Sequence, residues 1–371
     1  MTDLLPSHLI LPQEVISHAG ALFELPNLTA RFGVNGVIVH GRSLQASGVL
    51  DRLRDVFANP PMCWCHSGGE PTLAAVDALR AKIRERRPDW VAAVGGGSVM
   101  DLAKAAAGLA DAPQPTGHYQ RHPQEIPPAT LPLIAVPTTA GTGSEATIVS
   151  VLTDADRGLK QSIRHPTHLP RCVILDSDLL TACPSFTRAA SGLDAFVQAY
   201  ESLTSIHATP FTRALSETAL VQLAENLLPF YQGDNCRAAA MLQASFIAGV
   251  ALSHARLGII HGLAHPLGVR FHAPHGLACA CCLPACLALN RPAIQPDLDR
   301  INALYGIDIP RLVDEWMRAM NLPNPFQGQT ISDPEAVIRE TLASGSTRAN
   351  PVPITETNLP HLLSEIMGGI S

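Results

Sequence analysis

Four short runs rich in Val and Ile recur through the first half of the chain. Each run ends in Gly, Pro or Asp, as strands buried in a parallel sheet do. They are GVIVHG at 36–41, DWVAAVGGG at 89–97, LPLIAVP at 131–137 and RCVILD at 171–176. Segments with helical periodicity lie between them, such as ASGVLDRLRDVF and EPTLAAVDALRAKIRER. This alternation of strand and helix predicts an open parallel sheet.

After about Asp178 the strand-like runs stop, and apolar residues recur at helical spacing. The clearest segments are TPFTRALSETALVQLAENLLPFY and AAAMLQASFIAGVALSHA. A chain of 371 residues is long enough for two or three domains. We therefore expect an α/β domain over residues 1–180 and an all-α domain over residues 181–371. The polar, Pro-rich segment 111–129 is predicted to be a surface loop.

Charge and hydropathy exclude several classes of partner. The formal net charge is -6 at pH 7 and no cluster of Lys and Arg is present, so we expect neither nucleic acid nor an anionic membrane. The start, MTDLLPSHLILPQEV, has an acid where a signal peptide would be basic. The stretch GLACACCLPACLALN is too short to span a bilayer. A small molecule is therefore the expected partner, and no membrane contact is expected.

The cysteines indicate a redox compartment. They number nine, are unevenly spaced and cannot all pair, which favours a reducing cytoplasm over a disulfide framework. Four of them cluster near residue 280 but lack the paired CxxC spacing of a metal site. We interpret these four as small residues that pack between helices. They are Cys279, Cys281, Cys282 and Cys286.

Two turns rich in glycine and hydroxyl groups follow predicted strands. In the first turn, Gly95, Gly96 and Gly97 precede a helix that is expected to begin at Ser98, with Asp101 as the reciprocal acid of the helix cap. A backbone without Cβ atoms at a helix N-terminus lets a pyrophosphate approach free N–H groups. The spacing differs from GxGxxG, so an ordinary strand-to-helix turn explains these glycines about as well.

The second turn lies in VPTTAGTGSEA at 136–146. It places the hydroxyls of Thr138, Thr139 and Thr142 after a neighbouring strand. Ligands of open α/β sheets bind outside the carboxyl ends of the strands, so the two turns together predict a ligand-binding crevice. A polar loop with ordinary turn chemistry remains the alternative.

The helical half carries acidic and imidazole groups one helical turn apart. Asp194 and Gln198 share one face of an apolar helix, and His261 and His265 repeat this spacing in GIIHGLAHPLGVRFHAPHG, where His275 follows. A carboxylate among apolar residues is costly unless it is paired. One carboxylate and two imidazoles that converge would make a divalent metal site with open positions for a substrate oxygen. Each histidine alone would more often be a hydrogen-bonded core residue.

Four motifs, in this order, carry a family resemblance. GGGSxxDxxK, PTTAGTGSE, GLDAxxxAxES and HxxxHPLGxxFHxPHG resemble the iron-containing (group III) alcohol dehydrogenases, whose fold is shared with glycerol dehydrogenase and dehydroquinate synthase. The resemblance runs from about residue 30 to about residue 290, and the last eighty residues match only as generic helices. It implies that the α/β domain expected over residues 1–180 is Rossmann-like and binds NAD or NADP. It also implies that residues 181–371 form a helical domain that holds a divalent metal, iron or zinc, and binds the substrate.

The resemblance assigns the metal ligands residue by residue. The family holds its metal with an Asp, a His one turn later and two further His. Asp194, His261 and His275 match these positions, but Gln198 stands where the second ligand is His. An amide oxygen is a poorer ligand for iron or zinc than an imidazole. The resemblance therefore implies that the metal is bound weakly or is absent.

The family also implies roles for other residues. His265, which in the family lies near the nicotinamide at the cleft between the domains, is the expected proton relay. His272, on a predicted loop, is expected to assist substrate binding or proton exchange, with a plain surface role as the alternative. Lys160, in the strand-like RGLKQSI, resembles the family's cofactor-contacting lysine.

The choice between NAD and NADP is expected to depend on the end of the first predicted strand. Gly41, Arg42 and Ser43 stand where NAD-preferring relatives of the family tend to have Asp. No carboxylate is present there to repel a 2′-phosphate, and Arg42 offers a guanidinium. We therefore predict that NADPH is accepted.

The expected activity is hydride transfer between a nicotinamide and a small alcohol/aldehyde or ketone pair, in a homodimer or larger homo-oligomer. One alternative is a maleylacetate reductase-like enzyme that works without metal. Another is a dehydroquinate synthase-like lyase, which should carry more Lys and Arg near the metal than Arg256 and Arg270. A binding protein that has lost catalysis is the third, but both glycine-rich turns and His265 speak against it.

Overall fold

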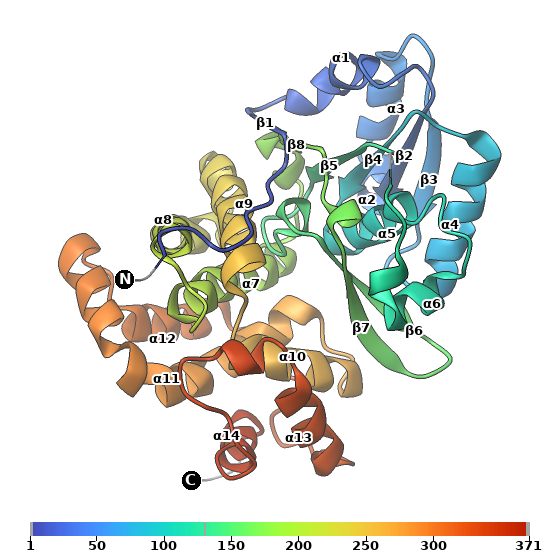
Figure 1. Ribbon diagram of the computed structural model, residues 1–371. Coiled ribbons are helices and arrows are strands. Elements are labelled where there is room, and N and C mark those ends of the chain that lie inside the picture. Colours follow the sequence, from blue (N-terminus) through green and yellow to red (C-terminus); the bar gives the residue numbers. More distant parts are fainter. Residues whose placement is uncertain (1–2, 130, 369–371) are drawn as a thin grey trace. The chain divides into compact units, whose positions relative to one another are not determined.

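The computed structural model describes residues 3–129 and 131–368 (Figure 1). It divides into two compact units. One unit, Ile10–Cys183, contains the sheet. The other, which is helical, comprises the described residues of Met1–Leu9 and Pro184–Ser371. The described residues before Ile10 thus pack with the helical unit, which the sequence did not predict. The Phe211 N–H, for example, donates to the Leu4 carbonyl at 3.1 Å.

The sheet of the first unit has six parallel strands. Their order is β1-β8-β5-β4-β2-β3. The four predicted strands are the inner ones, β2 (Gly36–Gly41), β4 (Trp90–Gly95), β5 (Leu133–Pro137) and β8 (Cys172–Leu175). The two edge strands, β1 (Glu14–Ser17) and β3 (Met62–His66), were not predicted. Both edge strands are partly exposed: β1 has only two apolar residues between Glu14 and Ser17, and β3 contains none of the Val, Ile or Leu typical of a buried strand.

Helices precede and follow these strands in the parallel-sheet rhythm (Figure 1). They are α1 (Leu25–Ala30), α2 (Arg42–Ala46), α3 (Val49–Asp55), α4 (Leu73–Arg86), α5 (Gly97–Gly108) and α6 (Thr116–Arg121). α5 is buried along almost its whole length, which its alanines allow because they bring its backbone close to the sheet. A separate antiparallel hairpin is formed by β6 (Val149–Asp154) and β7 (Leu159–Arg164).

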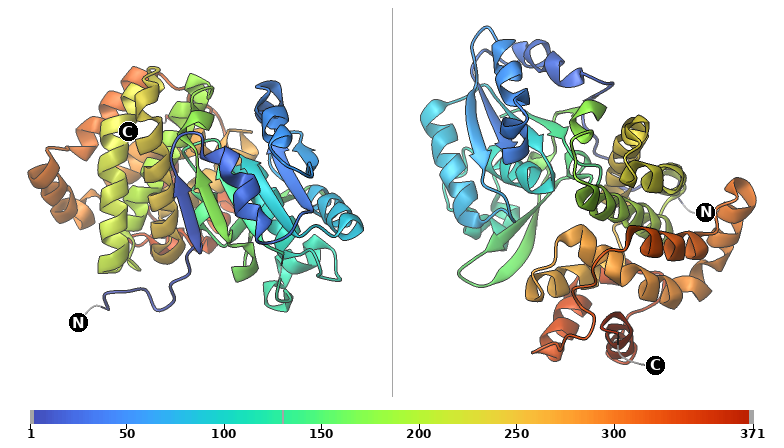
Figure 2. Two further views of the ribbon diagram at one scale, coloured as in Figure 1. Left: turned by 90° about the horizontal axis from the view of Figure 1, so that it is seen from above. Right: turned by 180° about the vertical axis from the view of Figure 1, so that it is seen from behind.

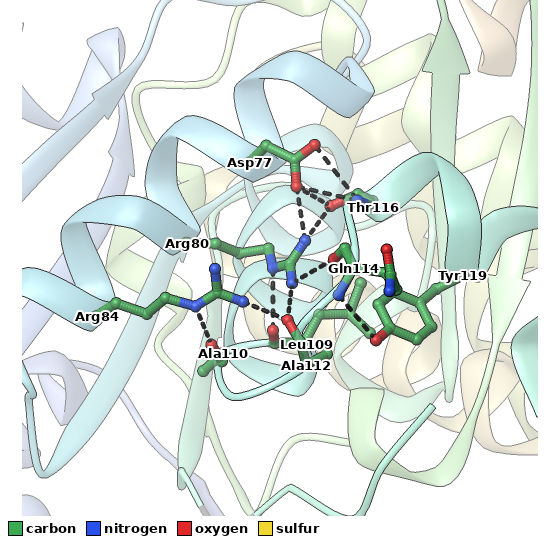
Figure 3. Close-up of polar contacts among 9 residues, drawn as sticks. All are labelled: Asp77, Arg80, Arg84, Leu109, Ala110, Ala112, Gln114, Thr116 and Tyr119. Atoms are coloured by element: carbon green, nitrogen blue, oxygen red, sulfur yellow. Dashed lines mark hydrogen bonds and ion pairs between the residues drawn. The ribbon is translucent and has the colours of Figure 1, made fainter. Parts of the chain in front are cut away.

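The prediction of a surface loop at 111–129 was wrong in part, because α6 lies within it and buries three of its residues. The reason is Arg80 on α4, which is 2% exposed and inserts its guanidinium beneath this segment (Figure 3). Arg80 donates to the carbonyls of Leu109, Ala112 and Gln114 at 2.5 to 2.9 Å. A buried cation that satisfies loop carbonyls holds the segment in one conformation.

The second unit is helical throughout its regular structure. Its elements are α7 (Ser185–Thr204), α8 (Pro210–Tyr231), α9 (Ala238–Ala255), α10 (Ile259–Arg270), α11 (His275–Tyr305), α12 (Ile309–Met320), α13 (Pro334–Ala343) and α14 (Leu359–Ile366). α7 is buried over nearly all of its length and packs against α8, α9 and α11 (Figure 2). The side chains of α7 therefore reach the middle of this unit.

Two segments of the helical unit are long and apolar enough to cross a membrane. They are Asn235–Ala255 and His275–Tyr305. The second continues well beyond the apolar stretch that the sequence indicated and contains three prolines. The apolar windows of the two are 61% and 56% buried within the protein, as is usual for core helices.

Candidate active site

Four potential metal ligands from three helices meet inside the helical unit. The ligand atoms of Asp194 on α7, His261 on α10, and His275 and Cys279 on α11 all lie within 4.8 Å of one another. Asp194 Oδ1 is 3.4 Å from His261 Nε2 and 3.7 Å from His275 Nε2. Three of the four residues are buried, and His275 is half-buried. The structure thus brings together the carboxylate and the two imidazoles that the sequence singled out.

Glycines next to the histidines allow these helices to approach closely. A Cβ atom on Gly276 would lie 2.2 Å from the carbonyl oxygen of Ala190, so the start of α11 touches the backbone of α7. A Cβ atom on Gly262 would lie 2.0 Å from the hydroxyl of Thr347. Any side chain at either glycine would push His275 or His261 away from Asp194.

Glu201, which the sequence analysis did not assign, orients His261. Its two carboxylate oxygens accept hydrogen bonds from His261 Nδ1 and the Ile260 N–H, both at 2.6 Å. Because Nδ1 is occupied in this way, Nε2 is the nitrogen that faces Asp194. Glu201 lies seven residues after Asp194, about two turns along the same face of α7, and this spacing could have identified it.

Three polar atoms at the site are buried without a hydrogen-bond partner. They are Asp194 Oδ1, Gln198 Oε1 and His261 Nε2. A buried polar atom that makes no hydrogen bond costs about 1 to 3 kcal/mol, so a shared cation would satisfy what the protein leaves unpaired. The residues present therefore fit a bound divalent metal. Gln198 lies one turn after Asp194 on α7, and its buried amide oxygen could also bind a metal. An amide oxygen is a weaker metal ligand than the imidazole that the family has at this position.

The electrostatics of the cluster are strongly coupled. Burial alone would lower the pKa of His261, but Cys279, Asp194 and Glu201 around it raise that pKa well above its ordinary value. Burial would raise the pKa of Asp194, but His275 and His261 hold it below its usual value. Burial raises the pKa of the Cys279 thiol to about 12. The negative charge that attracts a cation is therefore held on Asp194.

Cys279 departs from the sequence-based interpretation. We expected it to be one of four packing cysteines, but it lies one helical turn after His275, with its sulfur 3.8 Å from His275 Nε2. All nine cysteines are free, so no disulfide competes for it. The spacing HxxxC was visible in the sequence and could have identified Cys279, but His275 was not recognised there as the start of a helix.

The other two histidines of the motif, His265 and His272, lie outside the ligand cluster in different positions. The ring of His265 stacks on the ring of His275, with centroids 5.0 Å apart and planes inclined by 18°. His265 is half-buried, so it borders the cluster without belonging to it. His272 is exposed and outside the cluster, and its positive φ of 51° forms the turn that joins α10 to α11.

The first glycine turn of the sheet unit starts α5 one residue earlier than expected. The N-cap is Gly96 and not Ser98, and no side chain caps the helix, so the predicted cap of Ser98 with Asp101 is wrong. The cause is that Gly95 still belongs to β4 and Gly96 is extended, so the helix begins at Gly97, directly after the strand. The first N–H groups of a helix lack intrahelical partners, and here no side chain occupies them. An anion can therefore bind at this end of α5.

The second turn packs onto the first. A Cβ atom on Gly96 would lie 3.3 Å from the Thr139 hydroxyl, and one on Gly97 would lie 2.7 Å from a methyl of Thr142. The Thr138 N–H donates to the Gly95 carbonyl at 3.0 Å. The two turns thus form one surface of backbone and hydroxyl groups at the carboxyl ends of β4 and β5.

Beneath these turns lies a buried polar cluster that the sequence did not predict. Lys104 on α5 is wholly buried and donates three hydrogen bonds to Ser144 and Thr147, at 2.7 to 3.0 Å. Asp101, the expected cap residue, instead accepts hydrogen bonds from the Ser144 hydroxyl at 2.6 Å and the Val151 N–H at 2.9 Å. Burial lowers the pKa of Lys104 to about 8.

The other expected cofactor residues lie elsewhere in the sheet unit. Gly41 ends β2 and precedes α2, where Arg42 and Ser43 are both exposed. Lys160 lies on β7 and pairs through Nζ with Glu70 Oε1 at 2.8 Å. Glu70 belongs to the segment 67–72 between β3 and α4, so this ion pair joins that segment to the hairpin.

A parallel sheet with two glycine-rich turns, in one chain with a helical unit that buries a carboxylate and imidazole cluster, defines a two-domain dehydrogenase with a metal site. The chain belongs to the iron-containing alcohol dehydrogenase family: residues 12–177 match "Iron-containing alcohol dehydrogenase" and residues 188–367 match "Fe-containing alcohol dehydrogenase family, C-terminal". It is accordingly an NAD(P)-dependent oxidoreductase that acts on small alcohols and their carbonyl partners.

Two curated relatives and one solved structure illustrate the similarity. The probable alcohol dehydrogenase EutG of Escherichia coli (strain K12) is 42% identical over 288 residues, which are 77% of this chain and 72% of EutG. The NADPH-dependent butanol dehydrogenase of Clostridium saccharobutylicum is 31% identical over 285 residues, 76% of this chain and 73% of its own. The crystal structure of sulfoacetaldehyde reductase from Bifidobacterium kashiwanohense in complex with NAD+ superposes with a TM-score of 0.90 at 26% identity, covering 98% and 99% of the two chains.

Proposed function

We propose that this chain is a metal-dependent reductase of short-chain aldehydes that uses NADPH as its electron donor. The observation that carries the proposal is the convergence of Asp194, His261 and His275 within 4.8 Å, with two of their ligand atoms buried and unpartnered. A metal-independent reductase would have no need for such a set. The buried ligand set therefore favours a metal-dependent reductase over a maleylacetate reductase-like enzyme that works without metal.

The names of the relatives support the substrate class and the cofactor. The butanol dehydrogenase is named NADPH-dependent, and the solved relative in complex with NAD+ is a sulfoacetaldehyde reductase, so both dinucleotides occur among the relatives and both relatives act on short substrates. In this chain the dinucleotide lies on residues 95–98 and 138–142, where no side chain caps the first N–H groups of α5. Gly41, Arg42 and Ser43 receive the 2′-phosphate, and Lys160 contacts the cofactor next to the turn that Glu70 anchors.

The reaction moves a hydride from C4 of the reduced nicotinamide to the carbonyl carbon and a proton to the carbonyl oxygen. The products are NADP+ and a primary alcohol. A divalent metal held by Asp194, His261 and His275, with Gln198 as a weak additional donor, would polarise the carbonyl and stabilise negative charge on its oxygen. Glu201 keeps Nε2 of His261 directed at that position.

His265 supplies the proton. Its ring is half-buried and is fixed by stacking on His275, so it borders the ligand cluster while remaining reachable by water. An imidazole is the side chain best suited to exchange protons near neutral pH. His272, exposed on the turn after α10, assists by exchanging protons with solvent.

We also propose that the enzyme is a cytoplasmic homodimer. Nine free cysteines suit a reducing compartment. Strand β1 lies at the edge of the sheet and has one side without a partner strand, while Val15 on it is 40% exposed. An uncovered edge strand with exposed apolar residues favours association with a second copy.

The test combines elemental analysis with a reduction screen. Purified protein would be analysed for iron and zinc, and then assayed for NADPH and NADH oxidation with short aldehydes, ketones and maleylacetate. We expect substoichiometric metal, aldehyde reduction that a chelator abolishes, and higher metal occupancy in Gln198→His. If the unmodified protein binds one equivalent of metal tightly, the idea that Gln198 lowers the affinity for metal is refuted. Chelator-resistant reduction of maleylacetate alone would refute the proposed function.

A further inference from the structure

We propose that the thiolate of Cys279 is a ligand of the metal in this chain, so that the metal is held by one carboxylate, two imidazoles and one sulfur. This inference rests on the proposed metal site and goes beyond it, because the family resemblance assigns no cysteine. It makes the site of this enzyme selective for thiophilic divalent ions such as zinc, cobalt and cadmium over manganese or magnesium.

The first support is position. Cys279 lies four residues after His275 on α11, so the two side chains project from the same face of that helix. Its sulfur is 3.8 Å from His275 Nε2 and within 4.8 Å of the ligand atoms of Asp194 and His261. Asp194 and Gln198 form the same four-residue spacing on α7.

The second support is the contrast with the neighbouring cysteines. Cys281, Cys282 and Cys286 are also buried on α11, yet none of them joins the ligand cluster. Cys282, wholly buried three residues further on, packs as an apolar residue would. A general preference of this helix for small apolar side chains explains those three but does not explain a sulfur aimed at two imidazoles and a carboxylate.

The third support is the number of ligands. Three residues match the ligand positions implied by the resemblance, and Gln198 offers only an amide oxygen at the fourth. A thiolate is a much stronger ligand than an amide for zinc and similar ions, and coordination removes the thiol proton outright. Cys279 thus supplies a fourth ligand residue. The site stays weaker than one with a further imidazole at position 198, and a position on the metal stays available to the substrate oxygen.

The decisive experiment is cobalt substitution of the full-length enzyme. The protein would be stripped with a chelator, loaded with Co²⁺ and examined by absorption spectroscopy for the near-ultraviolet charge-transfer band that a cobalt–thiolate bond produces. We expect the band in the unmodified protein and in Cys282→Ser, and its loss in Cys279→Ser. X-ray absorption of the zinc-loaded protein should show one sulfur at about 2.3 Å, and none in Cys279→Ser.

A second measurement separates ligation from misfolding. The double variant Gln198→His with Cys279→Ser regains an imidazole, so we expect it to bind Co²⁺ stoichiometrically without the thiolate band. Cys279→Ser alone should lose more affinity for Cd²⁺ than for Mn²⁺, by at least about tenfold. A cobalt-loaded wild type without the band, or a band that persists in Cys279→Ser, would overturn the inference and leave the proposed function standing. A protein that binds no metal at all would overturn both.

Discussion

Lys104 Nζ lies 2.7 Å from the carbonyl oxygen of Ser144, and this contact joins the helix that begins at the first glycine turn to the segment that follows the second. The same amine donates to the hydroxyls of Ser144 and Thr147, so its three protons are all used. A wholly buried lysine with three acceptors on one loop fixes the distance between the two turns. The surface proposed to bind the dinucleotide therefore depends on a residue that does not belong to it.

Replacing Lys104 by Met should weaken cofactor binding and lower stability. We expect the NADPH dissociation constant to rise at least tenfold, or about 1.4 kcal/mol, because the second turn loses its anchor. The free energy of unfolding should fall by about 3 to 5 kcal/mol, because the buried Glu145 and the half-buried Asp101 lose the cation that stabilises their charges. Fluorescence titration and urea unfolding measure these effects. Lys82→Met, at an exposed position on α4, is the matched control, and Thr147→Val should give a smaller effect of the same sign. Equal NADPH affinity in all variants would contradict the anchoring role.

His168 should make the protein sensitive to acid. It is fully buried, neither ring nitrogen has a hydrogen-bond partner, and burial lowers its pKa to about 3. In the unfolded chain its pKa is about 6.5, so between pH 6.5 and 3 the unfolded state binds the extra proton. The stability contributed by neutral His168 is therefore complete above pH 6.5 and is lost as the pH falls toward 3, by about 1.4 kcal/mol per pH unit.

Urea unfolding across this pH range tests the assignment to His168. His168→Leu cannot take up the proton, so its unfolding free energy should fall less steeply with acid than that of the wild type. His122→Leu, at an exposed position of the same unit, should follow the wild type. Parallel curves for wild type and His168→Leu would show that other groups set the acid sensitivity.

Glu201→Gln should reduce metal affinity without removing a ligand. The amide keeps an acceptor for the Ile260 N–H but can no longer hold the Nδ1 proton of His261 with a full charge. Such outer-shell changes lower metal affinity by about 10 to 100-fold. Competition with a chromophoric chelator measures this effect, with Glu217→Gln on α8 as the control. Unchanged affinity in Glu201→Gln would mean that helix packing alone orients His261.

His265→Ala should lower turnover by about 10² to 10⁴ while leaving NADPH affinity and metal content unchanged, as expected for a general acid. Steady-state kinetics over a range of pH are the measurement, because the variant should also lose the limb of the profile that His265 sets. His361→Ala, at an exposed position on α14, is the control. Activity within a few-fold of the wild type would rule out His265 as the proton donor.

Arg42→Ala should lower kcat/KM for NADPH and leave kcat/KM for NADH nearly unchanged. The guanidinium is exposed at the start of α2, where a 2′-phosphate would be recognised by charge. Arg52→Ala, at a second exposed arginine of the same unit, controls for the general loss of a positive charge. A strong preference for NADH in the unmodified enzyme, or equal losses with both cofactors in Arg42→Ala, would show that this residue does not read the phosphate.

The inner strands and the metal-binding histidines could be predicted from the sequence because each has a local signature. β4 and β5 are buried on both faces and appear as continuous apolar runs, and His261 and His275 stand in a spaced motif. The edge strands lack the Val- and Ile-rich composition of the inner strands, because each is partly exposed to solvent. Glu201 and Cys279 could also have been predicted, because each lies at helical spacing from a recognised site residue, Asp194 or His275.

Other features depend on contacts between distant residues. The order of the segment after α5 is maintained by Arg80, whose acceptors lie 29 to 34 residues away. Nothing in the local sequence of a Pro-rich segment indicates that a buried guanidinium lies beneath it. The prediction of a cap at Ser98 was wrong because the extended Gly96 is itself the N-cap and the helix begins at Gly97.

The division of the chain into two units means that they can complete their folding at different times during synthesis. The sheet unit is continuous from Ile10 to Cys183 and can fold as soon as it has been synthesised, whereas the helical unit is assembled from two separate pieces. The hydrogen bond between the Leu4 carbonyl and the Phe211 N–H cannot form until Phe211 has been synthesised. At a translation rate of about 5 to 20 residues per second, Phe211 follows Leu4 after about 10 to 40 s. During that interval the first segment, with Leu4 and Leu5, is open to chaperones while an already folded domain separates it from its partner helix.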